Sequence, residues 1–512
     1  MIIERIVEGR IIFMKEVINK LADTKISTSY LFILLGVCAL MMTGYFSYAW
    51  FTVQGVQQYS VVTGNLSGSI TIGANSVAIE GAGTISYTPA TDSETVTITV
   101  TNSSDRTVKN SIYYYTLSDS SIEIGYTSDS TTIPTVEGVS VEKGKTLTYK
   151  IKINGSKGKA IKIGSSMGLS NSNLTLPSGT TAFSLLSEPS ASETLIAKAN
   201  PESLDYNSAT DEQKNQMWTF SHESTEQLGA TTDYRYIGAN PNNYVKFNDE
   251  LWRIIGVFDV DDGTGKIEKR LKIVRNESIG NYAWDNKDTT TGAEDENGKN
   301  NWSDARLNYL LNPGHESETY GGSLYWNRKS GTCYYGQNNA TMSCDFTSTG
   351  LTDAAKEMIG DAKWYLGGTA NYTSSSNGLA SHFYKYERGT TVYSGRSTNW
   401  TGKVGLIYPS DYGYATSGNS STTRATCLAK ELYNWDGASA CYQNDWLFKS
   451  SYMWSLSPRS SSSHRVFLVD RSGYVNGYIA TDAGGVWPVV YLKSTIKVTT
   501  GTGSSDSPFI LG

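Results

Sequence analysis

Histidine is scarce in this chain: only four of its 512 residues are histidine. The first, His222, stands in the segment HESTE rather than in H-E-x-x-H, so the paired imidazole ligands of a zinc protease are missing. His315, His382 and His464 have no Ser, Cys or Asp partner at a spacing typical of a catalytic motif. On these grounds we expect a protein that is not an enzyme.

An excess of basic residues is also missing. The chain has 43 Lys and Arg against 49 Asp and Glu, which gives a formal net charge of −6. Without a positive field there is no general attraction to phosphate backbones, so nucleic acid is not an expected partner. Tyrosine (34) and glycine (49) are abundant instead, a composition typical of β-rich exported proteins. The length allows about two to four domains.

Cysteine pairs with zinc-site spacing are absent as well. Of the five cysteines, Cys38 lies in a hydrophobic segment, whereas Cys333, Cys344, Cys427 and Cys441 lie in the C-terminal half. Neither couple has C-x-x-C spacing, which disfavours a zinc site. We expect two disulfides formed in an oxidising compartment, and the simplest of the three possible connectivities joins Cys333 to Cys344 and Cys427 to Cys441. Reduced thiols are the alternative.

Charged residues are missing altogether from residue 26 to residue 79. Within this stretch, residues 30–51 form an uncharged, largely apolar run long enough to cross a hydrocarbon core of about 30 Å as a helix. Lysines precede the run, so residues 1–29 are expected in the cytoplasm and the remainder outside. We therefore expect an extracytoplasmic protein, anchored in the membrane by residues 30–51 if that segment is not cut.

The same run contains a candidate cleavage site. Ser47 and Ala49 are small residues at the −3 and −1 positions of a cut before Trp50, which would release the chain as a secreted protein. The surrounding residues, TGYFSYAWFT, resemble the export signal of the camelysin and TasA family of matrix proteins. That resemblance implies processing by a dedicated signal peptidase.

Residues 53–185 show the period-two alternation of antiparallel strands. Val96, Ile98 and Val100 alternate with threonines, and turn signals separate such runs, so we expect an antiparallel β-sandwich of Ig-like or jelly-roll type. The stretch TVTITVTNSSDRTVKNSIYYYTL looks like the sandwich of the same family, which implies a secreted matrix or surface protein. The peptidase activity assigned to camelysin is not carried over, because residues 53–185 contain no histidine.

Residues 186–231 mix Ser, Pro and Ala with weak helical patterns, and we interpret them as a linker and helical lead-in. From residue 232 two strand-like runs flank an acidic, glycine-containing turn, which predicts a long hairpin. Asp259, Asp261 and Asp262 lie near its tip. The spacing of a calcium loop is broken there, so we interpret these carboxylates as solvated turn residues.

Helical spacing recurs in two later segments. NNWSDARLNYLLN predicts a helix with Ser303 as its N-cap, and TDAAKEMIGDAKW predicts another, capped by Thr352 and with Ala355, Met358 and Ile359 facing inward. The final runs TIKVTT and SPFILG predict a closing hairpin.

The order of these motifs resembles a C-type-lectin-like domain of gram-positive surface proteins, related to formylglycine-generating enzymes. The matching segments, within residues 232–512, are ELWRIIGVF, NNWSDARLNYLLN, and MWSLSPRSSSSHRVFLVDRSGYVNG followed by GVWPVVYL. The resemblance implies an α+β fold that hosts both binders and enzymes. The reactive thiol that such an enzyme carries near the end of the domain has no counterpart, because no cysteine follows Cys441.

Lectins of this fold often hold calcium with carboxylates and amides beside a tryptophan, because a hard cation prefers oxygen ligands and also orients sugar hydroxyls. Trp435, Asp436, Asn444, Asp445 and Trp446 are the nearest analogues here, so they are our candidate ligand-binding or calcium-binding residues. The alternative is that both tryptophans belong to the core. Apart from this calcium, no cofactor is expected.

These features predict a mainly β protein with an N-terminal membrane helix or signal, an antiparallel β-sandwich, and then an α+β C-type-lectin-like domain. We expect a cell-surface binding or adhesion protein that presents the lectin-like domain to a glycan or protein ligand. A first alternative is a subunit of a biofilm matrix or fibre, which would self-assemble. A second is an enzyme on the C-terminal fold.

Overall fold

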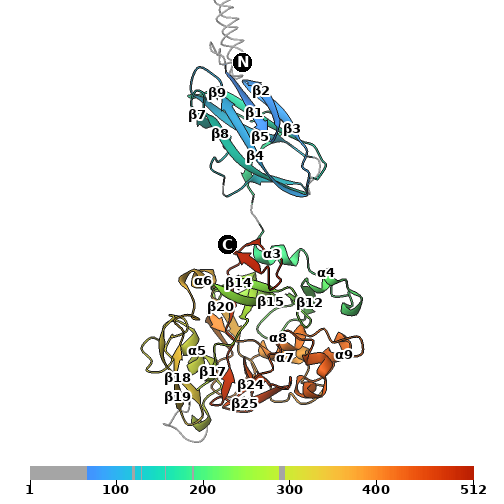
Figure 1. Cartoon of the computed structure of the whole chain (residues 1–512), viewed down its shortest axis with the longest axis vertical. Coiled ribbons are helices and arrows are strands. Elements are labelled where there is room, and N and C mark those ends of the chain that lie inside the picture. The colour runs from blue at the N-terminus through green and yellow to red at the C-terminus, as the bar shows by residue number, and fades with distance from the viewer. Residues whose placement is uncertain (1–65, 118–121, 129, 156, 187–188, 287–294) are drawn as a thin grey trace, which may run out of the picture. The chain divides into compact units, whose positions relative to one another are not determined.

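The computed structural model describes residues 66–512 apart from 118–121, 129, 156, 187–188 and 287–294. The predicted hydrophobic segment, Cys38 and the candidate cut before Trp50 lie outside the described residues. Among the residues that are described, no helix is both long and apolar enough to cross a membrane. With 39% strand and 14% helix the chain is mainly β, as predicted. It divides into two compact units, residues 1–187 and 188–512 (Figure 1).

The described part of the first unit contains eleven strands. They are β1 (Ser67–Ile72), β2 (Asn75–Glu80), β3 (Ala82–Tyr87), β4 (Ser93–Asn102), β5 (Val108–Tyr115), β6 (Glu123–Tyr126), β7 (Val139–Val141), β8 (Thr146–Asn154), β9 (Ile161–Leu169), β10 (Thr180–Ala182) and β11 (Ser184–Leu185). Their order is β10-β5-β9-β3-β2-β1-β4-β8-β6-β11, with β7 beside β5. Every pairing is antiparallel except that of β6 with β11.

Strands β2 and β3 are joined by a single residue pair, Glu80 with Ala82, so the ladder between the two halves of the sheet is minimal there. Its two halves enclose a single core, which joins Ile98 on β4 to Ile163 on β9. The predicted alternation is confirmed in β4, where the apolar side chains are buried and Ile98 pairs with Tyr149 of β8. Each fully buried aliphatic side chain contributes about 1.5–3 kcal/mol, so this alternation is a main stabilising feature of the sandwich.

The second unit opens with three short helical segments, α3 (Ala191–Ile196), η1 (Tyr206–Ser208) and α4 (Asp211–Lys214). A nine-stranded sheet follows, made of β12 (Trp218–His222), β13 (Thr231–Arg235), β14 (Tyr244–Phe247), β15 (Glu250–Asp261), β16 (Ile267–Arg275), β22 (Val404–Gly405), β27 (Val489–Tyr491), β28 (Val498–Thr500) and β29 (Phe509–Leu511). Its main order is β22-β27-β16-β15-β14-β29-β28, and β13 joins β12 to β15. Strand β29 lies parallel to β14, so the last hairpin is joined to an early strand of the unit.

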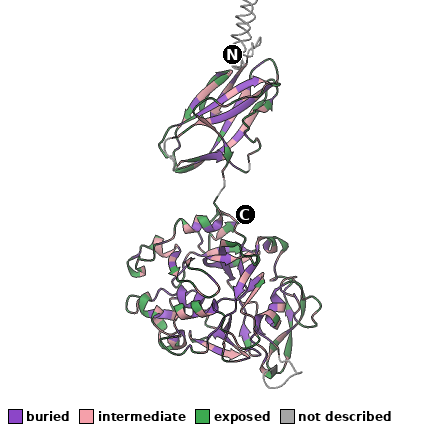
Figure 2. Cartoon of the chain, turned by 180° about the vertical axis from the view of Figure 1, so that it is seen from behind, coloured by how far each residue is buried: buried purple, intermediate pink, exposed green. Residues whose placement is uncertain are grey.

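A second sheet and two hairpins complete the strands of this unit. The sheet has the order β17 (Asn281–Ala283), β26 (Ala483–Gly485), β23 (Met453–Pro458), β24 (Arg465–Val469) and β25 (Val475–Ile479). The hairpins pair β18 (Ser330–Gly336) with β19 (Ala340–Asp345) and β20 (Ala362–Tyr365) with β21 (Asn399–Gly402). Buried residues line the strands of both units (Figure 2).

Short helices connect these strands. They are η2 (Asp295–Asn297), η3 (Trp302–Asp304), α5 (Arg306–Leu311), α6 (Asp353–Met358), α7 (Ala380–Glu387), α8 (Pro409–Ala415), α9 (Arg424–Leu428), η4 (Leu432–Gly437) and α10 (Ser439–Tyr442). The core of the unit contains six fully buried tryptophans: Trp252, Trp284, Trp302, Trp364, Trp435 and Trp454. These tryptophans belong to one large core cluster, and a separate small cluster joins Trp218 and Phe220 to Ala209 and Ile237.

The expected linker differs from the structure. Ala191 and Leu195 of α3 are buried in the main core of the second unit, and β12 pairs with β13 from Trp218 to His222. Most of residues 186–231 therefore belongs to the second unit. The helical patterns in this segment are weak because its helices have only four and six residues.

The predicted hairpin of residues 250–275 is present as β15 and β16, and the closing hairpin is present as β28 and β29. At the tip of the first, Asp261 accepts hydrogen bonds from the backbone N–H groups of Gly263 and Gly265, and Asp262 accepts one from Thr264. These two carboxylates therefore stabilise the turn.

The two predicted later helices are present in shortened form. Thr352 caps α6 as predicted and accepts a hydrogen bond from the Ala355 N–H, but α6 ends at Met358, and residues 362–365 form strand β20. Ser303 is not an N-cap, because it lies inside η3. Helix α5 begins instead at Arg306, whose N–H donates to the carboxylate of Asp285, a residue distant in sequence.

Candidate functional site

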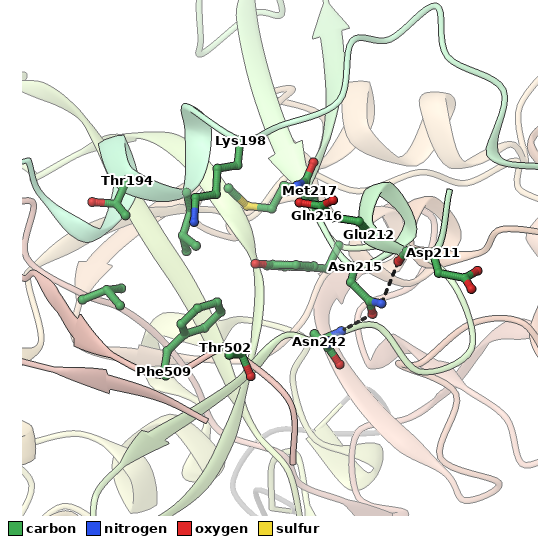
Figure 3. Close-up of a pocket in the computed structure, with 14 residues that line it drawn as sticks. Thr194, Lys198, Asp211, Glu212, Asn215, Gln216, Met217, Asn242, Thr502 and Phe509 are labelled. Carbon is green, nitrogen blue, oxygen red and sulfur yellow. Dashed lines mark hydrogen bonds between the residues drawn. The ribbon is translucent and has the colours of Figure 1, made fainter. Parts of the chain in front are cut away.

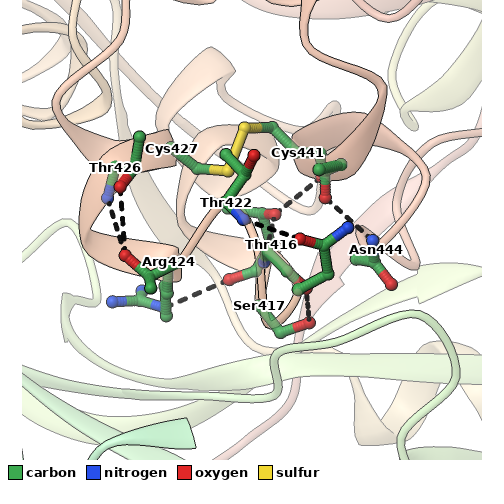
Figure 4. Close-up of a disulfide and its surroundings, with 12 residues drawn as sticks. Thr416, Ser417, Thr422, Arg424, Thr426, Cys427, Cys441 and Asn444 are labelled. Carbon is green, nitrogen blue, oxygen red and sulfur yellow. Dashed lines mark hydrogen bonds between the residues drawn. A yellow bond between two sulfur atoms is a disulfide. The ribbon is translucent and has the colours of Figure 1, made fainter. Parts of the chain in front are cut away.

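The cysteines form the simplest of the three connectivities. Cys333 pairs with Cys344 across β18 and β19, and Cys427 pairs with Cys441 between α9 and α10 (Figure 4). Near the second disulfide, the hydroxyl of Thr416 donates to the carbonyl of Cys441 over 2.6 Å. Two disulfides are consistent with an oxidising, extracytoplasmic setting.

The two tryptophans of the candidate ligand site are core residues, which corrects the expectation that they could meet a sugar. Trp435 is fully buried against Tyr412, with 5.2 Å between ring centroids. Trp446 is also buried, and its indole N–H donates to the carbonyl of Tyr236 over 2.9 Å. Neither ring has an exposed face on which a sugar could stack.

The polar members of the same group have separate roles. Asp436 is exposed and accepts a hydrogen bond from Gly437, whereas Asp445 is buried and accepts one from the Leu447 N–H. Asn444 donates to the carbonyl of Ala440 and is the one member that lines a cavity described below.

Within the described residues, no three His, Cys, Asp or Glu side chains gather in a way that could hold a metal ion. On the buried carboxylate of Asp445, Oδ1 accepts the hydrogen bond from the Leu447 N–H. Its Oδ2 atom has no hydrogen-bond partner among the described residues, and burial raises the pKa of this carboxyl well above its usual value. A calcium site at these positions is therefore not supported by the geometry, and the calcium expectation stays a prediction.

A cavity of about 700 Å³ lies elsewhere in the second unit, between α3, α4 and the turn of the last hairpin (Figure 3). We call it the α4 cavity. It is lined by Thr194, Leu195, Lys198, Asp211, Glu212, Asn215, Gln216, Met217, Tyr236, Asn242, Val498, Gly501, Thr502 and Phe509. Its volume falls within the range of about 300–1,000 Å³ that is typical of small-molecule sites.

Hydrogen bonds fix the wall of this cavity. Thr210 and Gln213 form a capping box at the start of α4, each side chain accepting from the other residue's backbone N–H. The Asn215 side chain donates to the carbonyl of Asp211 over 2.8 Å and accepts from the Asn242 N–H over 3.0 Å (Figure 3). Helix α4 is thereby attached to the loop that precedes β14, although it has only four residues.

Other polar side chains of the α4 cavity remain available. Among the described residues, Lys198, Glu212 and Gln216 have no hydrogen-bond or ion-pair partner for their side chains. Phe509 is half-buried and adds an aromatic surface from β29. The cavity thus combines donors, acceptors and an apolar ring.

Two further cavities border η1 and α4, and we call them the middle cavity and the α9 cavity. The middle cavity, of about 590 Å³, is lined by Tyr206, Asn207, Asp211, Lys214, Asn215, Ala239, Asn240, Pro241, Ser417, Gly418, Asn419 and Asn444. The α9 cavity, of about 390 Å³, is lined by Glu202, Ser203, Leu204, Asp205, Tyr206, Trp218, Thr219, Phe220, Ser221, His222, Tyr414, Arg424, Ala425 and Leu428. Shared lining residues connect all three cavities.

The α9 cavity is positioned by helix α9 and its disulfide. Arg424 lies 4.5 Å from the ring centroid of Phe220 and donates to the carbonyls of Thr416 and Tyr414, each over 3.1 Å. Because Cys427 fixes α9 to α10, the disulfide holds this guanidinium in place (Figure 4). The arrangement makes Arg424 a fixed donor at the wall of the cavity.

A buried ionic network stands behind the α9 cavity. His222 lines the cavity, stacks on Tyr384 with 3.7 Å between ring centroids, and places its Nε2 3.1 Å from Asp233. Asp233 pairs with Arg235 over 2.8 Å, and Arg235 pairs with Asp411 over 2.9 Å. The network thus joins β12, β13 and α8.

Asp411 accepts a further bond from the ammonium of Lys272, which is fully buried. Burial lowers the pKa of His222 below its usual value, although Asp233 favours the charged imidazole. Burial alone would raise the pKa of Asp233, but Arg235 and His222 outweigh it, so the pKa of Asp233 lies below its usual range. Because Arg235 and Asp411 are almost fully buried, they position the wall without lining the cavity, whereas His222 is the member of the network that lines it.

Comparison of the chain with protein-family models, with curated proteins and with solved structures finds no match. The resemblances to camelysin and TasA and to lectin-like domains therefore stay predictions. The α4 cavity was not predicted from the sequence because its helices lie in the segment that we interpreted as a linker. The signal that was available is the pair of capping-box patterns, Ser190 with Glu193 and Thr210 with Gln213.

Proposed function

We propose that this chain is an extracytoplasmic binding protein whose second unit binds a glycan in the α4 cavity. The observation that carries the proposal is the lining of that cavity, which combines amides and carboxylates with the half-buried ring of Phe509. Sugar hydroxyls both donate and accept, so they suit amide and carboxylate partners, and the apolar face of a sugar ring suits an aromatic surface.

The fixed geometry of the cavity supports a binding role. Asn215 and the capping box hold α4 in one position, so a ligand would meet a preformed wall rather than one that must be ordered on binding. The free side chains of Lys198, Glu212 and Gln216 are then available for direction-specific hydrogen bonds. The pairing of β14 with β29 supports the lectin-like interpretation, because it joins the two ends of the domain.

A glycan array probed with the full chain, with calcium and then with chelator, tests the proposal. We expect binding in both conditions, because the α4 cavity offers two carboxylates, on Asp211 and Glu212, and lysine rather than a set of calcium ligands. Gln216→Ala should weaken binding about tenfold, since one ligand hydrogen bond is lost. Gln337→Ala, on the exposed β18–β19 turn, is the matched control and should bind normally.

Absence of binding to any glycan, together with concentration-dependent assembly in light scattering, would overturn the proposal in favour of a matrix subunit. The edge strands of the sandwich do not favour that alternative, because β7, β10 and β11 have only three, three and two residues. Short edges offer few unpaired backbone groups to a neighbouring chain.

A further inference from the structure

The α4, middle and α9 cavities are linked in series by shared lining residues. Asp211 and Asn215 line both the α4 cavity and the middle cavity, and Tyr206 lines both the middle cavity and the α9 cavity. The segment from η1 to α4 is therefore bordered by all three in succession. Each cavity alone has the volume of a small-molecule site, so the series is larger than a single sugar unit requires.

We propose that these cavities form one groove that binds a linear, uncharged polysaccharide over several consecutive sugar units. This inference rests on the proposed glycan binding and assigns the class of ligand. The groove would take the chain along η1 and α4, with the first two units in the α4 cavity and later units in the middle and α9 cavities.

The lining of the groove alternates between aromatic rings and amides along its length, which suits a linear polysaccharide. Phe509 provides a partly exposed ring in the α4 cavity, and Tyr206 provides another between the middle and α9 cavities. Five of the twelve residues that line the middle cavity are asparagines, including Asn207 and Asn240. A protein ligand would place its largest apolar anchors at the centre of the interface, whereas the centre of this groove is polar.

The position of Tyr206 is fixed by its neighbours. Its ring lies 5.5 Å from that of Trp218, and its hydroxyl reaches Gly238 so closely that a Cβ atom on that residue would lie 2.5 Å from it. Gly238 also has a φ of 106°, a conformation that favours glycine. The ring of Tyr206 is therefore held in place at the junction of the middle and α9 cavities, where a sugar unit of the ligand would pack against it.

The charge of the groove disfavours a polyanionic ligand. The groove carries three basic side chains, of Lys198, Lys214 and Arg424, and these are outnumbered by the carboxylates of Glu202, Asp205, Asp211 and Glu212. A binding site for nucleic acid or an acidic glycan would instead show an excess of basic groups along its length. The amide-rich centre fits hydroxyl and acetamido groups.

The test is the dependence of affinity on chain length. Two ladders are titrated against the full chain by calorimetry, N-acetylglucosamine oligomers and glucose oligomers, both β-1,4-linked and one to six units long. We expect at least one ladder to bind at least about tenfold more tightly as the hexamer than as the dimer, because longer chains fill further cavities. Equal affinity for dimer and hexamer, or no binding of either ladder, overturns the inference.

A substitution in the middle cavity tests where the dependence of affinity on chain length arises. Asn207 is exposed and lies in the middle cavity, so Asn207→Trp should block that cavity, removing the advantage of the hexamer while leaving dimer binding in the α4 cavity unchanged. Lys329→Trp, an exposed position just before β18, is the matched control and should keep the full length dependence. If Asn207→Trp retains the length dependence, the groove does not run through the middle cavity and the inference is wrong.

The two proposals fail in different ways. A positive glycan array with affinity that is independent of length would retain glycan binding and remove the extended groove. A negative array and negative ladders would remove both.

Discussion

Asp445 is a single residue on which much of the fold around the cavities depends. Its backbone bridges to Gly238 and to Thr416, and its carboxylate accepts from the Leu447 N–H while the second oxygen has no partner among the described residues. A buried carboxylate of this kind costs stability when it is charged, because it has lost water without gaining a full set of donors.

We predict that Asp445→Asn stabilises the chain at neutral pH by about 1 kcal/mol. Burial raises the pKa of Asp445 in the folded chain, so the folded state binds the proton more tightly and wild-type stability falls as pH rises above the unfolded pKa. The neutral amide removes this dependence. Thermal unfolding at pH 8 and at pH 3.5 should show a gain at pH 8 that disappears at pH 3.5, and an equal gain at both would contradict the prediction.

The contribution of His222 to folding stability depends on pH in the opposite direction. Burial lowers its pKa in the folded chain, so below pH about 6.5 the unfolded chain takes up a proton that the folded chain resists. We expect the unfolding free energy to fall as pH drops from 7 to 5, and to fall less in His222→Phe, which keeps the ring packed on Tyr384. Denaturant titrations across this range measure the slope. Identical slopes in the wild type and in His222→Phe would show that folding does not change the pKa of His222, which would contradict the prediction.

At the scale of single elements, strands were easier to predict than the site. Val96, Ile98 and Val100 identify a strand because burial on one face imposes a local period of two. The β15–β16 hairpin was recognisable instead from two strand-like runs around a turn, and its strands are buried almost continuously. Thr352 identifies the start of α6 because the cap acts within three residues. Where the stabilising group came from a distant segment, as Asp285 does for α5, the local pattern pointed to the wrong residue, Ser303.

The candidate site was not predictable in the same way. Trp435 and Trp446 were predicted as the nearest analogues of a lectin site, but the packing of Trp435 on Tyr412 and the bond from Trp446 to Tyr236 are set by tertiary contacts. The α4 cavity is likewise formed by segments from opposite ends of the unit, and no window of sequence contains both. Of the features around the α4 cavity, only the two capping boxes could be recognised in the sequence.

The disulfide between α9 and α10 provides a prediction for an element. Replacing Cys427 and Cys441 by serine should cost about 3 kcal/mol, because the bond closes a loop with a sequence separation of 14 residues. It should also weaken hexamer binding, since α9 carries Arg424 at the α9 cavity. Chemical denaturation and calorimetry measure the two effects.

The other disulfide is the matched control. Cys333 and Cys344 close a loop of similar length within the β18–β19 hairpin, and neither residue lines the groove. Their double serine variant should lose comparable stability and keep its glycan affinity. A loss of affinity in both variants would mean that the effect is global destabilisation.

At the scale of the whole molecule, the two compact units differ in how they are stabilised. Both disulfides lie in the second unit, and the described sandwich has no cysteine. We predict two calorimetric unfolding transitions, of which only one moves to lower temperature when a reductant is added. A single transition that shifts as a whole would show that the units unfold together.

The parallel pairing of β14 with β29 has a consequence for biogenesis. Lys246 and Ile510 lie opposite one another, so the nine-stranded sheet cannot be completed until almost all of the second unit has emerged from the ribosome or the export channel. The sandwich has no such requirement on later sequence, because its strands pair among themselves. The emerging chain therefore folds its first unit early and keeps the second open to proteases and folding factors until its final strand arrives.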